Sequence, residues 1–188
     1  MANVSSAFTR DPVTFLGAHI LLVNTGNITK GVKRFVMEEQ DRDTSLAVLR
    51  LANDEDVDTF AGYYLPYEDN STKSVQLGNM ADFMFTQPMT GCSFVIDNKW
   101  YAPKVSHLNY QTPQQTIDQA EIDRNIVRKH GAPTTAWIVA NYFTLRKADY
   151  VPVGQDSQMH RTIVFGVRGW LGWTVYSVKD GAKPNRIN

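Results

Sequence analysis

Cys92-Ser93-Phe94-Val95-Ile96-Asp97-Asn98-Lys99 is a short apolar run that ends in turn-forming residues. Aromatic and β-branched side chains predominate in the run, which is typical of a β-strand. Asp97-Asn98-Lys99 predicts a turn into a second run that contains His107. The two runs are therefore expected to pair as a hairpin.

Similar short apolar segments recur along the chain, each bounded by Gly, Asn, Asp or Pro. They predict paired or packed sheets, and together with one well-marked helix they indicate an α+β fold. With 188 residues, 43% of them hydrophobic, the chain can form one sizeable core, so residues 1–188 are expected to be a single domain. The polar segment 182–188 is expected to be a frayed tail. The predicted strands are 13–23, 32–37, 46–52, 60–65, 81–85, 92–96, 136–145, 162–167 and 173–178.

The helix is predicted from its end signals. Thr112-Pro113-Gln114-Gln115 combines a capping threonine, a proline at the first helical position and a glutamine at the third, which is a capping-box arrangement. The helix is expected to end near Gly131, after the cations of Arg128-Lys129-His130. The helix dipole favours a positive charge at this end, so a charged His130 needs no functional site to explain it.

Charge and composition exclude several classes of function. Nineteen basic residues balance nineteen acidic ones, so there is no positive field to collect nucleic acid, and no nucleic-acid partner is expected. The apolar stretch 15–23 is interrupted by Gly17 and His19 and lacks a basic leading segment. It predicts neither a membrane span nor a cleavable signal peptide. No coiled-coil pattern argues for assembly, so a monomer is the default expectation.

Cys92 is the only cysteine of the chain. It excludes an internal disulfide and suits a reducing compartment, and no CxxC or Cys/His cluster predicts a zinc site. A lone thiol with a histidine fifteen residues downstream is a candidate catalytic pair. His107 as a neutral imidazole can take the thiol proton, and the thiolate then attacks a carbonyl carbon. An activated thiol of this kind is expected to react quickly with iodoacetamide near neutral pH.

Four neighbours of the pair are candidate site residues. Thr86 can orient His107 through its hydroxyl or line the pocket, or it can simply be a strand-end threonine bonded to its neighbours. Gly91, with Thr90 before it, can turn the chain so that backbone N–H groups form an oxyanion hole, although a glycine is equally common in an ordinary turn. Asn109 faces the same side as His107 if that segment is a strand, where it holds the imidazole, contacts substrate or is a solvated amide.

The surrounding motifs resemble a family of glutamine deamidase toxins. The motifs are Gln76-Leu77-Gly78, the segment 82–86 that ends in Thr86, and Thr90-Gly91-Cys92 with its downstream histidine. They are similar to the family formed by the Burkholderia lethal factor and the catalytic domains of the cytotoxic necrotizing factors, and Tyr64-Leu65-Pro66-Tyr67 shares this resemblance. Met89-Thr90-Gly91-Cys92 stands where the family has Leu-Ser-Gly-Cys. The resemblance extends over residues 45–180.

This resemblance implies a β-sandwich of mixed sheets flanked by helices and loops. It implies that Cys92 is the nucleophile, His107 the general base and acid, and Thr86 a supporting pocket residue, with no metal or organic cofactor. The implied substrate is a glutamine of a host protein, either a Rho-family GTPase or a translation-initiation helicase. The implied setting is a secreted bacterial virulence effector that acts in the host cytosol.

Other functions stay open on the residues alone. The same pair suits a cysteine peptidase or a transglutaminase-type acyl transferase, in which an amine replaces water in the second step. A different class is a non-catalytic β-sandwich binding module, in which Cys92 is a buried and inert small hydrophobe.

Overall fold

Alternating apolar residues build two β-sheets in the computed structural model, which describes residues 2–26, 28–41, 43–132, 141–152, 160–179 and 182–188. Within these ranges the larger sheet is mixed, because β2 pairs with β4 and β5 pairs with β7 in parallel while the other neighbours are antiparallel. Its order is β13-β12-β11-β7-β5-β3-β4-β2, with β1 beside β3. Its strands are β1 (Ala2–Asn3), β2 (Ile20–Asn24), β3 (Gly31–Asp41), β4 (Leu46–Leu51), β5 (Phe60–Leu65), β7 (Phe83–Thr86), β11 (Thr162–Gly169), β12 (Gly172–Lys179) and β13 (Asn185–Arg186).

The smaller sheet is antiparallel and has the order β10-β8-β9-β6 in the described part of the chain. It contains the predicted hairpin, since β8 pairs with β9 from Ser93 opposite Leu108 to Ile96 opposite Val105. The strand order leaves β6 on one edge of this sheet. The strands are β6 (Ser71–Gln76), β8 (Ser93–Asp97), β9 (Lys104–Asn109) and β10 (Tyr142–Leu145).

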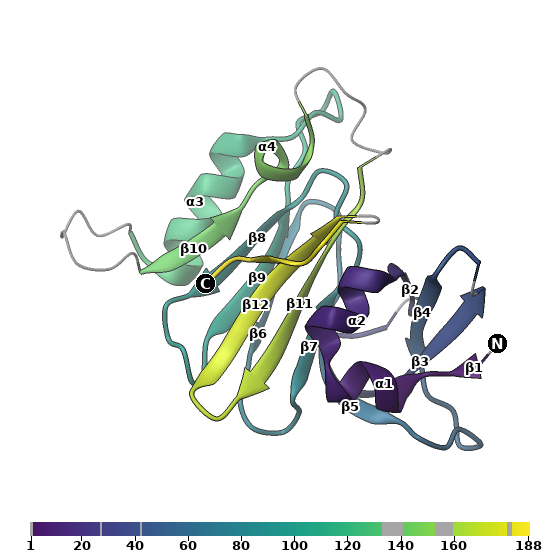
Figure 1. Ribbon diagram of the computed structural model, residues 1–188. Helices are drawn as coiled ribbons and strands as arrows, with labels where there is room; N and C mark the ends of the chain where they lie inside the picture. Colours follow the sequence, from purple (N-terminus) through teal and green to yellow (C-terminus); the bar gives the residue numbers. More distant parts are fainter. Residues whose placement is uncertain (1, 27, 42, 133–140, 153–159, 180–181) are drawn as a thin grey trace.

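The sheets and helices form four layers (Figure 1). On β5, Tyr63 and Leu65 face the smaller sheet, whereas Phe60 and Tyr64 face the two N-terminal helices. This alternation follows from the two-residue period of a strand and gives the larger sheet an apolar core on each side. Of the two later helices, α3 covers the outer face of the smaller sheet. The helices are α1 (Ser5–Arg10), α2 (Pro12–Ala18), α3 (Gln119–His130) and α4 (Lys147–Tyr150). The predicted α+β class with packed sheets is confirmed, although only the larger sheet is mixed and the smaller one is antiparallel.

The predicted strand 13–23 is wrong in its first half, which forms α2. The Asp11 side chain accepts a hydrogen bond from the Thr14 backbone N–H at 3.1 Å, and Pro12 occupies the first turn. These are helix-start signals, and they override the apolar run that follows. The strand β2 begins only at Ile20.

The long helix ends as predicted but begins later. Gly131 follows its last residue with a positive φ of 86°, and its N–H donates to the Val127 carbonyl. The cap is Asp118, which accepts from the Glu121 N–H at 2.9 Å, instead of Thr112. Thr112 closes a separate turn, in which its N–H donates to the Thr116 carbonyl at 2.8 Å.

Two further predictions concern the last third of the chain. The segment 182–188 is not a frayed tail: Asn185–Arg186 pairs with β12, and the Asn188 side chain accepts from the Val175 N–H at 2.7 Å. Of the predicted strand 136–145, residues 142–145 form β10, and residues 136–140 lie outside the described residues. Strand β6 was not predicted, whereas β9 is the second run of the predicted hairpin.

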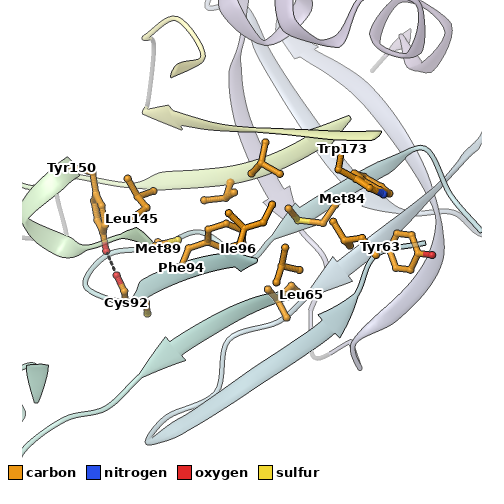
Figure 2. Packing of buried hydrophobic residues seen from close by; sticks show 14 of the residues in the cluster. Tyr63, Leu65, Met84, Met89, Cys92, Phe94, Ile96, Leu145, Tyr150 and Trp173 are labelled. Atoms are coloured by element: carbon orange, nitrogen blue, oxygen red, sulfur yellow. Dashed lines mark hydrogen bonds between the residues drawn. The ribbon is translucent and has the colours of Figure 1, made fainter. Parts of the chain in front are cut away.

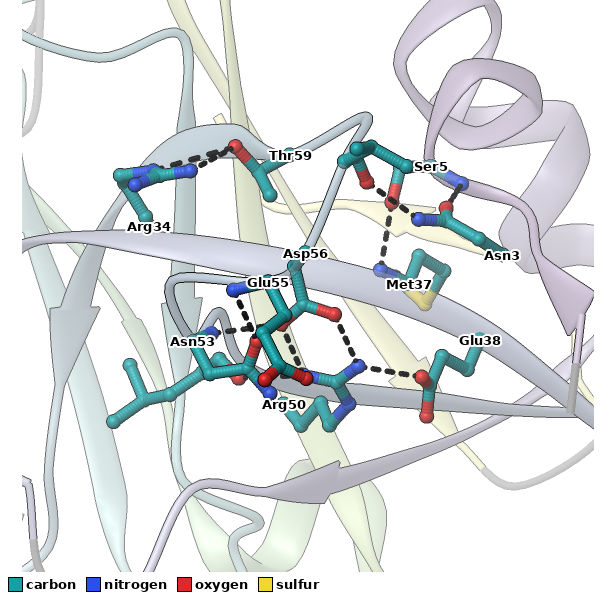
Figure 3. Close-up of polar contacts among 12 residues, drawn as sticks. Asn3, Ser5, Arg34, Met37, Glu38, Arg50, Asn53, Glu55, Asp56 and Thr59 are labelled. Atoms are coloured by element: carbon teal, nitrogen blue, oxygen red, sulfur yellow. Dashed lines mark hydrogen bonds and ion pairs between the residues drawn. The ribbon is translucent and has the colours of Figure 1, made fainter.

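An ion-pair cluster joins β4 to its surroundings at one end of the larger sheet (Figure 3). The Arg50 guanidinium donates to Glu38 on β3 at 2.6 Å and to both carboxylate oxygens of Asp56 at 2.7 Å. Hydrogen bonds from Arg50 and from the Asn53 backbone lower the pKa of Asp56 to about 2. Arg50 thereby links two strands and the loop that follows β4.

Candidate active site

The hairpin places Cys92 and His107 on one face of the smaller sheet. Phe94 on β8 lies directly opposite His107 on β9, and Cys92 precedes Phe94 by two residues. Side chains two residues apart along a strand share a face, so Cys92 and His107 are diagonal neighbours. Cys92 packs in the same apolar cluster as Phe94, between the two sheets (Figure 2). The predicted pairing of the two segments is therefore confirmed.

Tyr150 anchors the backbone at the start of β8. Its hydroxyl donates a hydrogen bond of 2.8 Å to the carbonyl oxygen of Cys92 (Figure 2). The Tyr150 side chain is 1% exposed, and burial is the main reason that its pKa lies above the ordinary tyrosine value. This contact fixes the position of Cys92 from a residue 58 positions away, in α4.

His107 is buried, and its ring makes little hydrogen bonding within the described residues. It is 2% exposed, and neither Nδ1 nor Nε2 makes a hydrogen bond of normal geometry with a described residue, although the ring has a weaker hydrogen-bond interaction with the Leu65 backbone. Burial lowers the pKa of His107 to about 4, an effect that the nearby Leu65 carbonyl only partly opposes. The imidazole is therefore neutral near pH 7 and can accept a proton. A buried polar side chain without partners normally costs about 1–3 kcal/mol, so its presence calls for an explanation.

Cys92 is a protonated thiol in the resting structure. It is 4% exposed, and burial is the main reason that its pKa rises to about 12. The negative charge of Asp69 raises it further, whereas the backbone N–H groups of Gly91, Thr90 and Cys92 itself lower it. Three successive N–H groups beside the sulfur can also stabilise an oxyanion. The expected activated thiol is thus not found in this closed state.

A loop between β5 and β6 covers the pair. The Tyr67 ring lies beside His107, with centroids 6.0 Å apart, and the Tyr67 hydroxyl donates to the Asp69 carboxylate. Asn109 donates from Nδ2 to the Tyr67 hydroxyl and to Asp69 Oδ1, each at 3.1 Å. Burial and the bond to Asp69 raise the pKa of Tyr67. The Tyr67 backbone N–H donates a hydrogen bond of 3.1 Å to Gln87 Oε1.

Residues 66–69 of this loop line an open hollow of about 650 Å³ at the surface. Neither Cys92 nor His107 lines it. The side chains that line the hollow include two basic ones, Lys30 and Lys73, and two acidic ones, Glu68 and Asp69. A polar peptide segment can bind such a surface next to the covered thiol.

Thr86 does not orient His107. It is fully buried, and its hydroxyl accepts a hydrogen bond of 3.0 Å from the Val164 N–H on β11. The two nitrogens of His107 have no partner in the described residues, so the predicted contact between Thr86 and the imidazole is wrong. Thr86 continues the β7–β11 ladder one residue beyond the pair Phe85 and Phe165. Its position supports the start of the loop that leads to Cys92.

The other predicted neighbours lie near the site for different reasons. Asn109 shares the face of His107 on β9, as predicted, but it is 2% exposed and binds Tyr67 and Asp69, so it is neither solvated nor bonded to the imidazole. A Cβ on Gly91 would lie 3.3 Å from Ile117 Cδ1, so the end of the Ile117 side chain would have to shift by a few tenths of an ångström to accept one. The φ of Gly91 is not positive, and Thr90 beside it is half-buried in the same bend.

Sequence reasoning missed two residues of the site, Tyr67 and Asp69. Tyr67 belongs to a motif that carries the family resemblance, but the pattern assigned it no role. Asp69 lies outside the motifs that carry the resemblance. Their contacts with Asn109 span 40 or more positions and have no local signature.

The described residues contain neither a metal site nor a membrane-spanning helix. No group of three or more His, Cys, Asp or Glu side chains there could hold a metal ion. In the same part of the chain, no helix has the length and apolar character needed to cross a membrane. Neither a scan against protein-family models nor a search of curated proteins finds a match for this chain.

Proposed function

We propose that this protein is a thiol-dependent deamidase that converts a specific glutamine of a host protein to glutamate. The observation that carries the proposal is His107: a buried, neutral imidazole that lacks a hydrogen bond of normal geometry within the described residues and lies on the same sheet face as the only cysteine. His107 is neutral near pH 7 and its ring can therefore take a proton, but burial makes it a weak base in the closed state, so the proposal requires the site to open. The family resemblance supplies the reaction, and the geometry is compatible with it.

The mechanism is a double displacement at the glutamine carboxamide. The Cys92 thiol passes its proton to His107 as sulfur bonds to the carbonyl carbon, and the backbone N–H groups beside the sulfur stabilise the oxyanion. His107 then protonates the leaving nitrogen, the C–N bond breaks, and ammonia departs from a thioester. Water, deprotonated by His107, attacks the thioester and gives glutamate and the free thiol. If an amine replaces water, the product is a transglutamination adduct.

Opening of the Tyr67 loop is part of this proposal. A substrate that binds the hollow lined by this loop contacts Tyr67 and Asp69, the two residues whose bonds to Asn109 close the site. Removing Asp69 from the thiol also removes a charge that raises the pKa of Cys92. The resting thiol is thus protected, and substrate binding activates it.

We also propose a biological setting on the basis of the family resemblance. The substrate is a Rho-family GTPase or a translation-initiation helicase, and the protein is a secreted bacterial effector that acts as a monomer in the host cytosol. A single unpaired thiol suits that reducing compartment.

A non-catalytic binding module is the second candidate, and the burial of Cys92 favours it. Cys92 packs among Met89, Phe94 and Tyr150 and carries a raised pKa, which is how an inert core cysteine behaves. This alternative leaves the unpartnered imidazole of His107 without a purpose.

Trapping of the thioester tests the proposal. A cell lysate is incubated with the protein and hydroxylamine, and peptide mass spectrometry then maps glutamines converted to glutamate or to the γ-hydroxamate. We expect both products at the same glutamine with the parent protein and neither with Cys92→Ser. Equal maps from the parent and Cys92→Ser would leave the binding module as the better account.

A further inference from the structure

A second chain of polar side chains crosses the opposite face of the smaller sheet. The His130 Nδ1 atom bonds to the Asp97 carboxylate, and its Nε2 atom lies 2.7 Å from the Ser106 hydroxyl. The Ser106 hydroxyl in turn lies 2.7 Å from the hydroxyl of Ser74. Ser106 alternates with His107 along β9, so this chain lies on the α3 side of the sheet and is separate from Cys92.

The contacts allow only one consistent direction of proton donation. The aspartate accepts from Nδ1–H, which leaves Nε2 as an acceptor for the Ser106 hydroxyl. The oxygen of Ser106 then accepts from the Ser74 hydroxyl. Burial of the ring keeps the pKa of His130 below the ordinary histidine value, although Asp97 opposes the shift, so the ring is neutral near pH 7. The sequence interpretation of His130 as a helix-end cation does not account for its contacts with Asp97 and Ser106.

Accessibility distinguishes the two serines. Ser106 is fully buried under α3, which packs over β8 and β9. Ser74 lies on the edge strand β6 and is only partly buried, so a small molecule can approach it. Ser106 can relay a proton but cannot attack a substrate.

A basic hollow of about 530 Å³ adjoins the Asp97 and His130 end of this chain, and Ser74 and Ser106 lie next to its lining without forming part of it. His130 and Asp97 line the hollow. Gln76 and Lys104 line it as well, and this pair lies two residues along the strands from the pair Ser74 and Ser106, on the same face of the sheet. Lys99 and Lys129 add two more cations to the lining. Three ammonium groups against one carboxylate, itself bonded to His130, favour an anionic ligand.

We propose that Asp97, His130, Ser106 and Ser74 form a second hydrolytic centre, with Ser74 as nucleophile, that acts on small acyl esters carrying an anionic group. The order of acid, imidazole and hydroxyl is that of a serine hydrolase triad, which is recognised by geometry and not by sequence order. Here a second hydroxyl extends the triad to the surface.

The reaction needs no group other than these side chains, the substrate and water. The Ser74 oxygen bonds to the acyl carbon while its proton passes to Ser106, and the Ser106 proton passes to His130 Nε2. The proton returns along the same path to the leaving alkoxide as the C–O bond breaks. Water then attacks the acyl-serine with the same relay as base, and the carboxylic acid departs.

A fluorophosphonate probe, which reacts with activated serines, tests the centre on the full chain. We expect peptide mapping to find the probe on Ser74, and labelling to fall on the order of a hundredfold or more in His130→Gln and in Asp97→Asn. Ser71→Ala, on the same edge strand, serves as the matched control with unchanged labelling. Because the labelled residue is identified directly, the result does not depend on any reaction at Cys92.

A matched pair of esters tests the proposed preference for anions. Hydrolysis of 4-acetoxybenzenesulfonate is expected to exceed that of neutral 4-acetoxybenzenesulfonamide by about tenfold, and the difference should shrink as salt is added. Failure of the parent protein to label at Ser74 would overturn the proposal without reference to any variant. Labelling of equal rate in a folded His130→Gln protein would overturn it as well, since the four groups would then be only a structural network.

Discussion

The phenol ring of Tyr67 lies beside the imidazole of His107, with ring centroids 6.0 Å apart and planes inclined by 56°. Tyr67 is tied to Asn109 through its hydroxyl, and Asn109 is two residues beyond His107 on the same strand. One tyrosine thus closes the site over both members of the candidate pair. The closed state explains why a potential nucleophile has the pKa of an inert thiol.

Truncation of Tyr67 should expose Cys92. With a pKa of about 12, Cys92 in the parent protein should react with iodoacetamide at pH 7.5 more than about a hundredfold slower than free cysteine. In Tyr67→Ala the rate should rise on the order of tenfold or more, because water reaches the sulfur. Tyr101→Ala, at a tyrosine that is 67% exposed, is the control. Rapid alkylation of the parent protein would refute the closed state.

Replacement of His107 by leucine should stabilise the fold. Two buried ring nitrogens without partners disappear, and leucine of similar volume fills the space, so the free energy of unfolding should rise by about 1–3 kcal/mol. Urea unfolding measures the change. The same variant should lose glutamine conversion, which is the pattern of a residue kept for chemistry at the expense of stability. A destabilised His107→Leu protein would mean that the imidazole has a structural role.

The stability of the parent protein should depend on pH through His107. Its pKa is about 4 in the folded chain and near the ordinary value of about 6.5 in the unfolded chain, so the unfolded state binds more protons between these values. The contribution is complete above pH 6.5 and is lost as the pH falls toward 4, by on the order of 3 kcal/mol. Urea unfolding across this range, for the parent and His107→Gln, isolates the effect. Parallel curves for the two proteins would contradict the low pKa.

Replacement of Thr86 by valine should have the opposite effect to His107→Leu. The Val164 N–H loses its acceptor inside the core, and the free energy of unfolding should fall by about 1–3 kcal/mol. Thr162→Val is the matched control, because the Thr162 hydroxyl is buried and has no hydrogen-bond partner in the described residues. Equal losses of stability in both variants would show that the 3.0 Å contact contributes nothing.

The sequence predicts the parts of the site that depend on local pattern. The run 92–96, the turn at Asp97-Asn98-Lys99 and the two-residue period together place Cys92 and His107 on one face. The partner of Thr86 was not predictable in this way, because Val164 is 78 positions away and the contact depends on which strands become neighbours. The closure by Tyr67 likewise depends on the loop between β5 and β6, which connects the larger sheet to the smaller one.

Competing local signals explain the helix errors. Thr112-Pro113 and Asp118 are both plausible helix starts, and the bridge between Gln111 and Ile117 keeps the first of them in a turn. The run from Phe15 suits either a buried helix or a strand, and Asp11-Pro12 decides for the helix. Local pattern alone does not rank such alternatives.

The most direct test of the central claim compares the parent protein with Cys92→Ser in a cell lysate and maps every new Gln-to-Glu change by peptide mass spectrometry. The account predicts at least one glutamine that the parent converts and Cys92→Ser leaves intact. A lysate in which no glutamine changes in a Cys92-dependent way would contradict the deamidase and favour a binding module with an inert core cysteine.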